Sequence, residues 1–176
     1  MKIIKFPDCR QTYDYDCGAR VVQSVLAYYG LNIRGGKIMK LAGTNKRQGT
    51  PIKGIIKVAK AYGFKYKAGE MNVSQVKEYI DRGIPVILLL QAWSRRKKID
   101  WKNNWADGHY VVAIGYDNRR LYFKDPSSIW RTFLTYRELK ERWHDIDIYA
   151  SDKYYNYGIV IYGRKVCDLK KMVHLD

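Results

Sequence analysis

The chain has 176 residues, 47% of them hydrophobic and 14% aromatic, so it can bury the core of one folded domain and is not a disordered tail. Its 33 basic and 17 acidic residues give a formal charge of +16, which favours acidic peptides, nucleic acid or anionic surfaces as partners and is silent about fold. No apolar run approaches the roughly 18 residues that cross a bilayer. We therefore expect a single domain over residues 1–176 without an integral membrane segment.

The cysteines are odd in number, so Cys9, Cys17 and Cys167 cannot all pair within one chain. The sequence has no C-x-x-C spacing and only three histidines, so we expect no structural zinc, other metal or cofactor. Reduced thiols in a reducing compartment are the simplest explanation, with Cys9 and Cys167 structurally incidental. Because the N-terminus also lacks a signal-peptide pattern, a cytoplasmic location is expected.

The first half of the chain is predicted to be mainly helical. Thr50 is a plausible N-cap for a helix whose first residue is Pro51. Asn72 and Gln75 have the spacing of a capping box. In chain order we expect a helix from Cys17 to Tyr29, a helix over 37–42, a helix over 52–62, a strand over 64–68 and a helix from Asn72 to Asp81.

The second half changes to the period of strands. Thr135 and Glu138 form a second capping-box pattern, opening a helix through Trp143. Residues 145–157 and the tail from Gly163 show little predicted order. The expected strands are 86–90, 110–116, 121–124 and 159–162. Helices first and strands later predict an α+β fold, with an N-terminal helical half on a mainly antiparallel sheet.

Cys17 stands at the start of the first predicted helix. Unpaired backbone N–H groups and the positive end of the helix dipole favour thiolate over thiol at that position. The thiolate is the nucleophilic form, so Cys17 is a candidate nucleophile. Taken alone, Cys17 is better explained as a small buried residue at a helix start, because free cysteine is often buried.

His109 and Asp125 are candidates for the base and its orienting carboxylate. His109 precedes the strand 110–116, and Asp125 ends the strand that follows. Antiparallel pairing returns the end of the second strand to the start of the first. Gln11, six residues before Cys17, is a candidate amide donor to an oxyanion. Alone, each has a structural explanation; together they indicate acyl transfer by a cysteine nucleophile.

Three ordered segments also resemble a known family. Residues 11–18 (QTYDYDCG), residues 108–117 (GHYVVAIGYD) and Asp125-Pro126 are similar to the bacteriocin-processing, double-glycine leader peptidases, family thirty-nine of the cysteine peptidases. The likeness extends over about residues 6–143. It implies a papain-like fold with Cys17 as nucleophile, His109 as general base and acid, Asp125 as orienting carboxylate and Gln11 with the Cys17 N–H as oxyanion donors.

The resemblance does not carry over transport or ATP use. Many relatives are domains of ABC exporters, whereas this sequence contains no G-x-x-x-x-G-K-[ST] loop, so a stand-alone form is expected. A peptide or small-protein substrate follows from the family, and an acidic partner from the charge. No cofactor is implied.

Two further function classes stay open. The same triad serves a papain-like acyl transferase or an amide hydrolase. A basic binding module with a vestigial triad is the third hypothesis, because residues 93–105 interleave tryptophans with basic residues, a pattern that suits acidic partners or single-stranded nucleic acid. A solvated loop anchored by its aromatic residues explains that segment as well, and nucleic acid is not the favoured partner.

Overall fold

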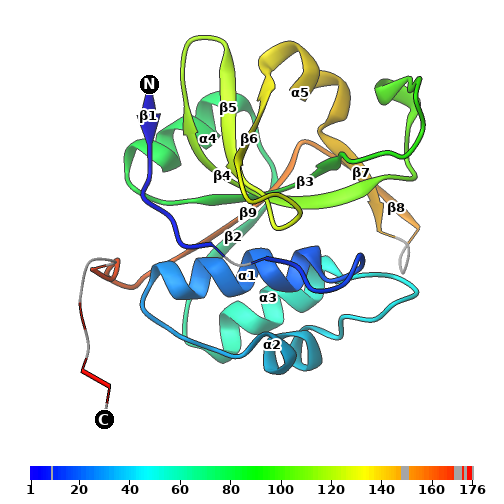
Figure 1. Cartoon of the computed structure of the whole chain (residues 1–176). Helices are drawn as coiled ribbons and strands as arrows, with labels where there is room; N and C mark the ends of the chain where they lie inside the picture. The colour runs from blue at the N-terminus through cyan, green and yellow to red at the C-terminus, as the bar shows by residue number, and fades with distance from the viewer. Residues whose placement is uncertain (9, 148–150, 169–171, 173, 176) are drawn as a thin grey trace.

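The computed structural model describes residues 1–8, 10–147, 151–168, 172 and 174–175, and it shows a sheet with helices on both faces (Figure 1). The helices are α1 (Cys17–Tyr28), α2 (Gly35–Ala42), α3 (Ile52–Ala61), α4 (Val73–Asp81) and α5 (Tyr136–Arg142), with a short 3-10 helix η1 (Trp101–Asn103). The strands are β1 (Lys2–Ile3), β2 (Lys65–Glu70), β3 (Val86–Gln91), β4 (Gly108–Tyr116), β5 (Arg120–Lys124), β6 (Arg131–Thr135), β7 (His144–Asp147), β8 (Asp152–Tyr155) and β9 (Tyr157–Tyr162).

The main sheet runs in the order β2-β9-β3-β4-β5-β6, with β1 beside β4, and its neighbours pair antiparallel. β7 and β8 form a separate antiparallel ribbon. The predicted α+β class with a mainly antiparallel sheet is confirmed. Among the described residues, no helix has both the length and the apolar character that crossing a bilayer requires.

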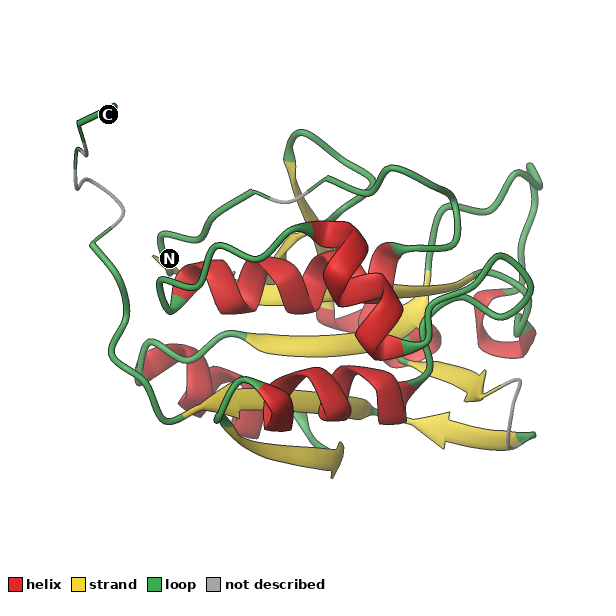
Figure 2. Cartoon of the chain, turned by 90° about the horizontal axis from the view of Figure 1, so that it is seen from below, coloured by secondary structure: helices red, strands yellow, loops and turns green. Residues whose placement is uncertain are grey.

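Alternation along the central strands builds two cores. Leu89 and Tyr110 point to the face covered by α1, α2 and α3, which lie in front of the strands in Figure 2. Leu90 and Val111 point to the opposite face, where they pack with residues of α4 and α5. Because both faces of β3 are covered, all six of its residues are buried, which explains its continuous apolar sequence.

Most predicted helices are confirmed within a few residues, and both capping boxes form. Asn72 with Gln75 caps α4, and Thr135 with Glu138 caps α5. β4 begins at Gly108, so His109 is the second residue of the strand and not the residue before it. This adds two pairs to the β3 ladder, in which His109 lies opposite Leu90 and Gly108 lies opposite Gln91.

The expectation of little order over residues 145–157 is wrong for the part that the structure describes. β7 and β8 pair there, with His144 opposite Tyr155. The ribbon escaped prediction because its strands are short and carry mostly polar residues, so they lack the apolar run of a buried strand. β6 was missed for the same reason, since its residues are only partly buried.

Thr50 does not cap the helix that follows it, which corrects that prediction. The N-cap of α3 is Pro51, without a side-chain hydrogen bond. The Thr50 hydroxyl instead accepts the backbone N–H of Ala19, 3.1 Å away in the first turn of α1. Gly18 permits this approach, because a Cβ at that position would lie 2.6 Å from the Thr50 Cβ. A buried threonine from another segment thus caps the helix that begins at Cys17.

We expect Thr50→Val to lower the free energy of unfolding by about 1–2 kcal/mol, because it leaves the Ala19 N–H unsatisfied in the interior while keeping the side-chain shape. Urea denaturation measures the change. Thr50→Ser keeps the hydroxyl and is the matched control, with a smaller loss. Equal midpoints for Thr50→Val and the unchanged protein would show that this cap contributes nothing.

Candidate active site

The structure brings together Cys17, His109 and Asp125. Cys17 is the first residue of α1 and is 9% exposed. In the β4–β5 hairpin Val112 pairs with Lys124, so Asp125 leaves β5 at the end of the sheet where His109 lies. The His109 Nε2 and Asp125 Oδ1 atoms are 2.9 Å apart. The Cys17 side chain interacts electrostatically with the His109 ring, and because Asp125 engages Nε2, Nδ1 is the ring nitrogen that is left for the sulfur.

The surroundings of His109 favour its charged form. Burial alone lowers the pKa of the imidazole, but hydrogen bonds and charge interactions with Asp125 and Cys17 outweigh it and raise the pKa to about 10. For Asp125, burial alone raises the pKa, and the hydrogen bond and charge of His109 hold it below its ordinary value. The geometry therefore favours a protonated imidazole between an ionised carboxylate and the cysteine sulfur.

Both oxygens of Asp125 are engaged. Oδ1 accepts the Ser127 backbone N–H at 2.8 Å in addition to the His109 ring. Oδ2 accepts the indole N–H of Trp93 at 2.9 Å. The carboxylate is 3% exposed, so these donors replace the water that it has lost.

Gln11 is tied to the turn that follows Asp125. Its backbone N–H donates to the Pro126 carbonyl at 3.0 Å, and its Oε1 accepts the Ser127 hydroxyl at 2.8 Å. Its Nε2 donates to the Tyr13 carbonyl at 3.1 Å. An amide nitrogen carries two hydrogens, so one of them is used in this contact. The structure thus places Gln11 in the loop before α1 and joins it to Asp125 through Ser127.

Asp16 is a buried residue of this region that sequence reasoning did not single out. Its carboxylate is fully buried, forms an ion pair with Arg20 at 3.0 Å, and accepts the backbone N–H groups of Thr12 and Tyr13. It therefore folds residues 12–16 back onto the first turn of α1, which holds Gln11 and Cys17 on adjacent parts of the chain. The feature of the sequence that could have singled out Asp16 is its position directly before the candidate nucleophile Cys17.

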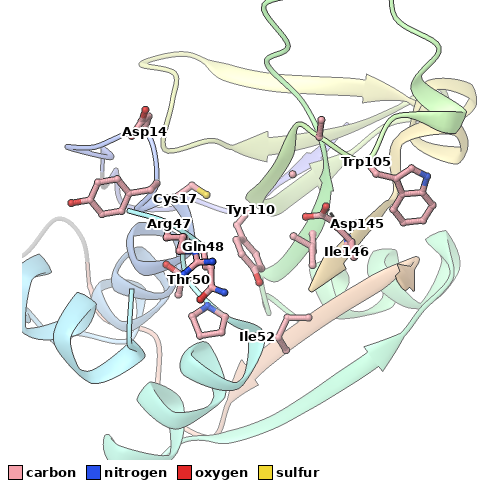
Figure 3. A pocket seen from close by; sticks show the side chains of 16 residues that line it. Asp14, Cys17, Arg47, Gln48, Thr50, Ile52, Trp105, Tyr110, Asp145 and Ile146 are labelled. Atoms are coloured by element: carbon pink, nitrogen blue, oxygen red, sulfur yellow. Dashed lines mark hydrogen bonds between the residues drawn. The ribbon is translucent and has the colours of Figure 1, made fainter. Parts of the chain in front are cut away.

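A cleft of about 240 Å³ opens beside Cys17 (Figure 3). One wall comes from residues 47–52, and the other from Trp105, Ala106, Gly108 and Tyr110 with the start of β7. The lining residues are Asp14, Tyr15, Cys17, Arg47, Gln48, Gly49, Thr50, Pro51, Ile52, Leu89, Trp105, Ala106, Gly108, Tyr110, Asp145 and Ile146. The cleft is thus lined by charged, polar, aromatic and aliphatic side chains together.

Asp145 is a cleft residue that the sequence did not reveal, because its segment was expected to have little order. It is 7% exposed and its Oδ1 accepts the Gln91 side-chain amide at 2.8 Å. A Cβ at Gly108 would lie 2.2 Å from the Asp145 Oδ2. Glycine before His109 is therefore required by the carboxylate that lies against it.

The described cysteines lie at opposite ends of α1. Cys17 begins the helix, whereas the Cys167 sulfur lies 3.4 Å from the Ala27 carbonyl near its end, and both are free. Cys9 lies outside the described residues. Within the described part of the chain, no cluster of three or more His, Cys, Asp or Glu side chains is placed to hold a metal ion.

Comparison with known proteins decides the family. The model of the Peptidase C39 family matches residues 5–154. The chain belongs to the Peptidase C39 family. It is therefore a cysteine-type peptidase with a papain-like fold, as the sequence motifs predicted.

Individual relatives agree with the family. An uncharacterized protein of Methanothermobacter marburgensis is 25% identical over 118 residues, which cover 67% of this chain and 70% of that protein. The peptidase domain of Streptococcus ComA, a bi-functional ABC transporter involved in a quorum sensing pathway, is 25% identical with a TM-score of 0.64, over 87% of this chain and 95% of that chain.

Two further solved structures show the same fold. A C39-like peptidase from Bacillus anthracis is 16% identical with a TM-score of 0.68, over 93% of this chain and 98% of that chain. A double glycine motif protease from an AMS/PCAT transporter, solved with its leader peptide, is 19% identical with a TM-score of 0.64, over 91% and 93% of the two chains.

The lowered pKa of Asp125 predicts an acid-dependent stability difference for this C39 peptidase. The folded pKa lies below the ordinary value of 3.8, so the ionised carboxylate stabilises the fold above that pH and the contribution is lost as pH falls through the folded pKa. We expect Asp125→Asn to unfold at lower urea than the unchanged protein near neutral pH, by about 1.5–3 kcal/mol for a hydrogen bond to a charged group.

When Asp125→Asn and the unchanged protein are compared at progressively lower pH, the difference between their free energies of unfolding should become smaller. Urea denaturation of both proteins at several pH values from neutral to about one unit below the ordinary carboxyl pKa measures it. A difference that stays constant over this range would mean that Asp125 does not change protonation with the stated sign.

Proposed function

We propose that residues 1–176 form a single peptidase domain that hydrolyses a peptide bond through Cys17, His109 and Asp125, with Gln11 as an oxyanion donor. The observation that carries the proposal is the buried His109 ring, which is hydrogen-bonded to Asp125 and interacts electrostatically with the sulfur at the start of α1. A nucleophile, a base and an orienting carboxylate in one line are what covalent acyl transfer requires. The cleft beside Cys17 supplies room for the substrate chain.

In the proposed reaction the Cys17 sulfur attacks the scissile carbonyl carbon, and the carbonyl electron pair moves onto oxygen. His109 gives its proton to the leaving amine as the C–N bond breaks, which yields an acyl-enzyme and a free amino terminus. His109 then takes a proton from water, whose oxygen attacks the thioester carbonyl. Collapse of that intermediate releases the carboxylic acid and restores the thiolate–imidazolium pair.

The oxyanion donors are the second amide hydrogen of Gln11 and the backbone N–H of Cys17. The first Gln11 hydrogen is bonded to the Tyr13 carbonyl, and the Ser127 hydroxyl fixes the amide oxygen. The Cys17 N–H has no partner within its own helix, because it belongs to the first turn. Donors held in this way need no reorientation when the oxyanion forms.

The substrate that we propose is a peptide or small protein that carries a double-glycine leader. Family membership and the leader-bound AMS/PCAT relative support it. The charge of +16 adds a preference for acidic substrates or partners. Free thiols at Cys17 and Cys167 support a reducing compartment, and we infer the cytoplasm.

We expect Cys17→Ala to abolish cleavage of a synthetic leader peptide with a Gly-Gly motif, with a fall of at least ~10⁴-fold in kcat/KM, because no other group replaces the nucleophile. Cys167→Ala removes a free thiol at the other end of α1 and is the matched control, with activity retained. Mass spectrometry of the products gives both the rate and the cleavage position.

Labelling with a thiol reagent tests activation without a substrate. Cys17 should react faster than Cys9 or Cys167, and His109→Ala should slow its reaction. Equal reaction of all three thiols, together with salt-sensitive nucleic-acid binding that Cys17→Ala leaves unchanged, would replace the peptidase proposal with a basic binding module.

Gln11→Glu tests the oxyanion donor, because it keeps the side-chain shape and its Ser127 contact but loses both N–H groups. We expect kcat to fall by about 10²–10³-fold, as for the loss of one oxyanion donor elsewhere. The rate of Cys17 alkylation should change far less than kcat, since that reaction forms no tetrahedral oxyanion. Parallel losses in both assays would show that Gln11 acts on the nucleophile instead.

A further inference from the structure

Trp93 is exposed, strained and hydrogen-bonded to the buried carboxylate of Asp125. Its backbone φ is 60°, in the left-handed region that a bulky side chain rarely occupies. The side chain is 57% exposed, yet its indole N–H donates to the Oδ2 of Asp125 at 2.9 Å. Backbone strain of this kind persists only where the surrounding structure enforces it, and it concentrates at functional sites.

The base of the 93–106 loop enforces the position. The Ala92 backbone N–H donates to the Asp107 carbonyl at 2.9 Å, which closes the loop where β3 ends and β4 is about to begin. Inside the loop, the Arg96 guanidinium bonds the side chains of Asn104 and Asp107. These hydrogen bonds hold both ends of the loop. The left-handed backbone conformation of Trp93 then turns the chain so that its indole reaches Asp125.

The Trp93 bond holds the one Asp125 oxygen that the hairpin itself does not hold. Oδ1 is fixed by His109 and by the Ser127 N–H, whereas Oδ2 accepts the indole N–H of Trp93. Leu90, Val111 and Phe123 line a recess together with Trp93 and Asp125, so the bond lies against apolar surroundings that strengthen it. A carboxylate held at both oxygens does not rotate, and the ring bonded to it keeps its direction.

We propose that Trp93 is a positioning residue of the peptidase reaction, which fixes Asp125 so that His109 stays directed at the Cys17 sulfur. This inference rests on the proposed roles of those three residues. It also explains why a tryptophan stands in the basic loop at its first position, where a left-handed backbone favours glycine or asparagine.

The charged and titratable groups around Asp125 come from elements other than the loop that contains Trp93. They are His109 from β4, with Cys17 of α1 behind it, Arg142 of α5 across the recess, and Lys124, whose ammonium pairs with Asp8 at 2.7 Å. The Trp93 hydrogen bond is one of the contacts that lower the pKa of Asp125. Loss of this donor therefore moves the pKa of Asp125 upward, and with it the acidic limb of any rate that needs the ionised carboxylate.

The test is the rate of Cys17 alkylation by iodoacetamide as a function of pH, followed by mass spectrometry of the Cys17 peptide. Trp93→Phe keeps an aromatic ring and removes the N–H donor, and it should slow the reaction about ten- to a hundredfold, as for a lost bond to a charged group. Its acidic limb should move to higher pH. Trp130→Phe makes the same change at an indole that is 73% exposed, and should match the unchanged protein.

Peptide cleavage adds a second readout. Trp93 does not line the cleft beside Cys17 among the described residues, so Trp93→Phe should lower kcat and leave KM unchanged. Trp93→Gly removes the same donor but relieves the left-handed strain, so its unfolding temperature should be equal to or above that of Trp93→Phe, while alkylation slows as in Trp93→Phe. If Trp93 had only a structural role, its substitution would instead lower the unfolding temperature and the alkylation rate together.

An unchanged rate in Trp93→Phe, or a slower rate without movement of the acidic limb, would overturn the positioning role. Failure of the proposed function gives a different result. Cleavage that survives Cys17→Ala, or alkylation that is unaffected in His109→Ala, would reject the triad whatever the Trp93 variants do.

Discussion

The His109 ring is the interaction on which the site depends, because it joins the two halves of the fold. On one side it bonds a carboxylate at the end of β5, and on the other it meets a sulfur at the start of α1. The antiparallel β4–β5 hairpin sets the distance between His109 and Asp125. The packing of α1 on the helical face of the sheet sets the distance between His109 and the Cys17 sulfur. A small shift of the helix along the sheet would break the second contact and leave the first intact. The core between α1 and the sheet, which includes Tyr110 and Leu89, therefore fixes the geometry of the site as much as the polar groups do.

Around this ring the polar groups form a connected set. Ser127 bonds both Asp125 and Gln11, so the turn after β5 fixes the proposed orienting carboxylate and the proposed oxyanion donor together. Asp16 fixes the loop that contains Gln11 and pairs with Arg20 on α1. Buried polar groups are stable only when they are satisfied, and here each finds a partner in another element. The same bonds that satisfy them also determine where the reacting atoms lie.

The sequence predicted the elements well where local rules decide them, and it predicted that Cys17, His109 and Asp125 lie near one another because the topology there is simple. Cys17, His109 and Asp125 each stand at the end of a periodic segment, so a hairpin and one helix suffice to place them near one another. Contacts between distant segments were not predictable in the same way. Nothing in the spacing links Thr50 to Ala19 or Trp93 to Asp125, because those bonds arise from loops whose paths depend on tertiary packing. Asp145 was hidden for a different reason, since its short polar strand has no apolar periodicity.

Thr50 lines the cleft, and its hydroxyl also accepts a backbone N–H in the first turn of α1. A single side chain therefore both shapes the cleft wall and caps the helix. The position of the loop that ends at Thr50 and the position of the first turn of α1 consequently depend on each other. Exchange of residues 45–49 for a loop of another length, as an engineer would attempt when retargeting the enzyme, would also displace the hydroxyl and loosen the nucleophile. Diversification of this wall is thus confined to loops that return a hydroxyl-bearing residue to the same point, whereas the opposite wall is constrained through Asp145, which lies against Gly108 and accepts the Gln91 amide.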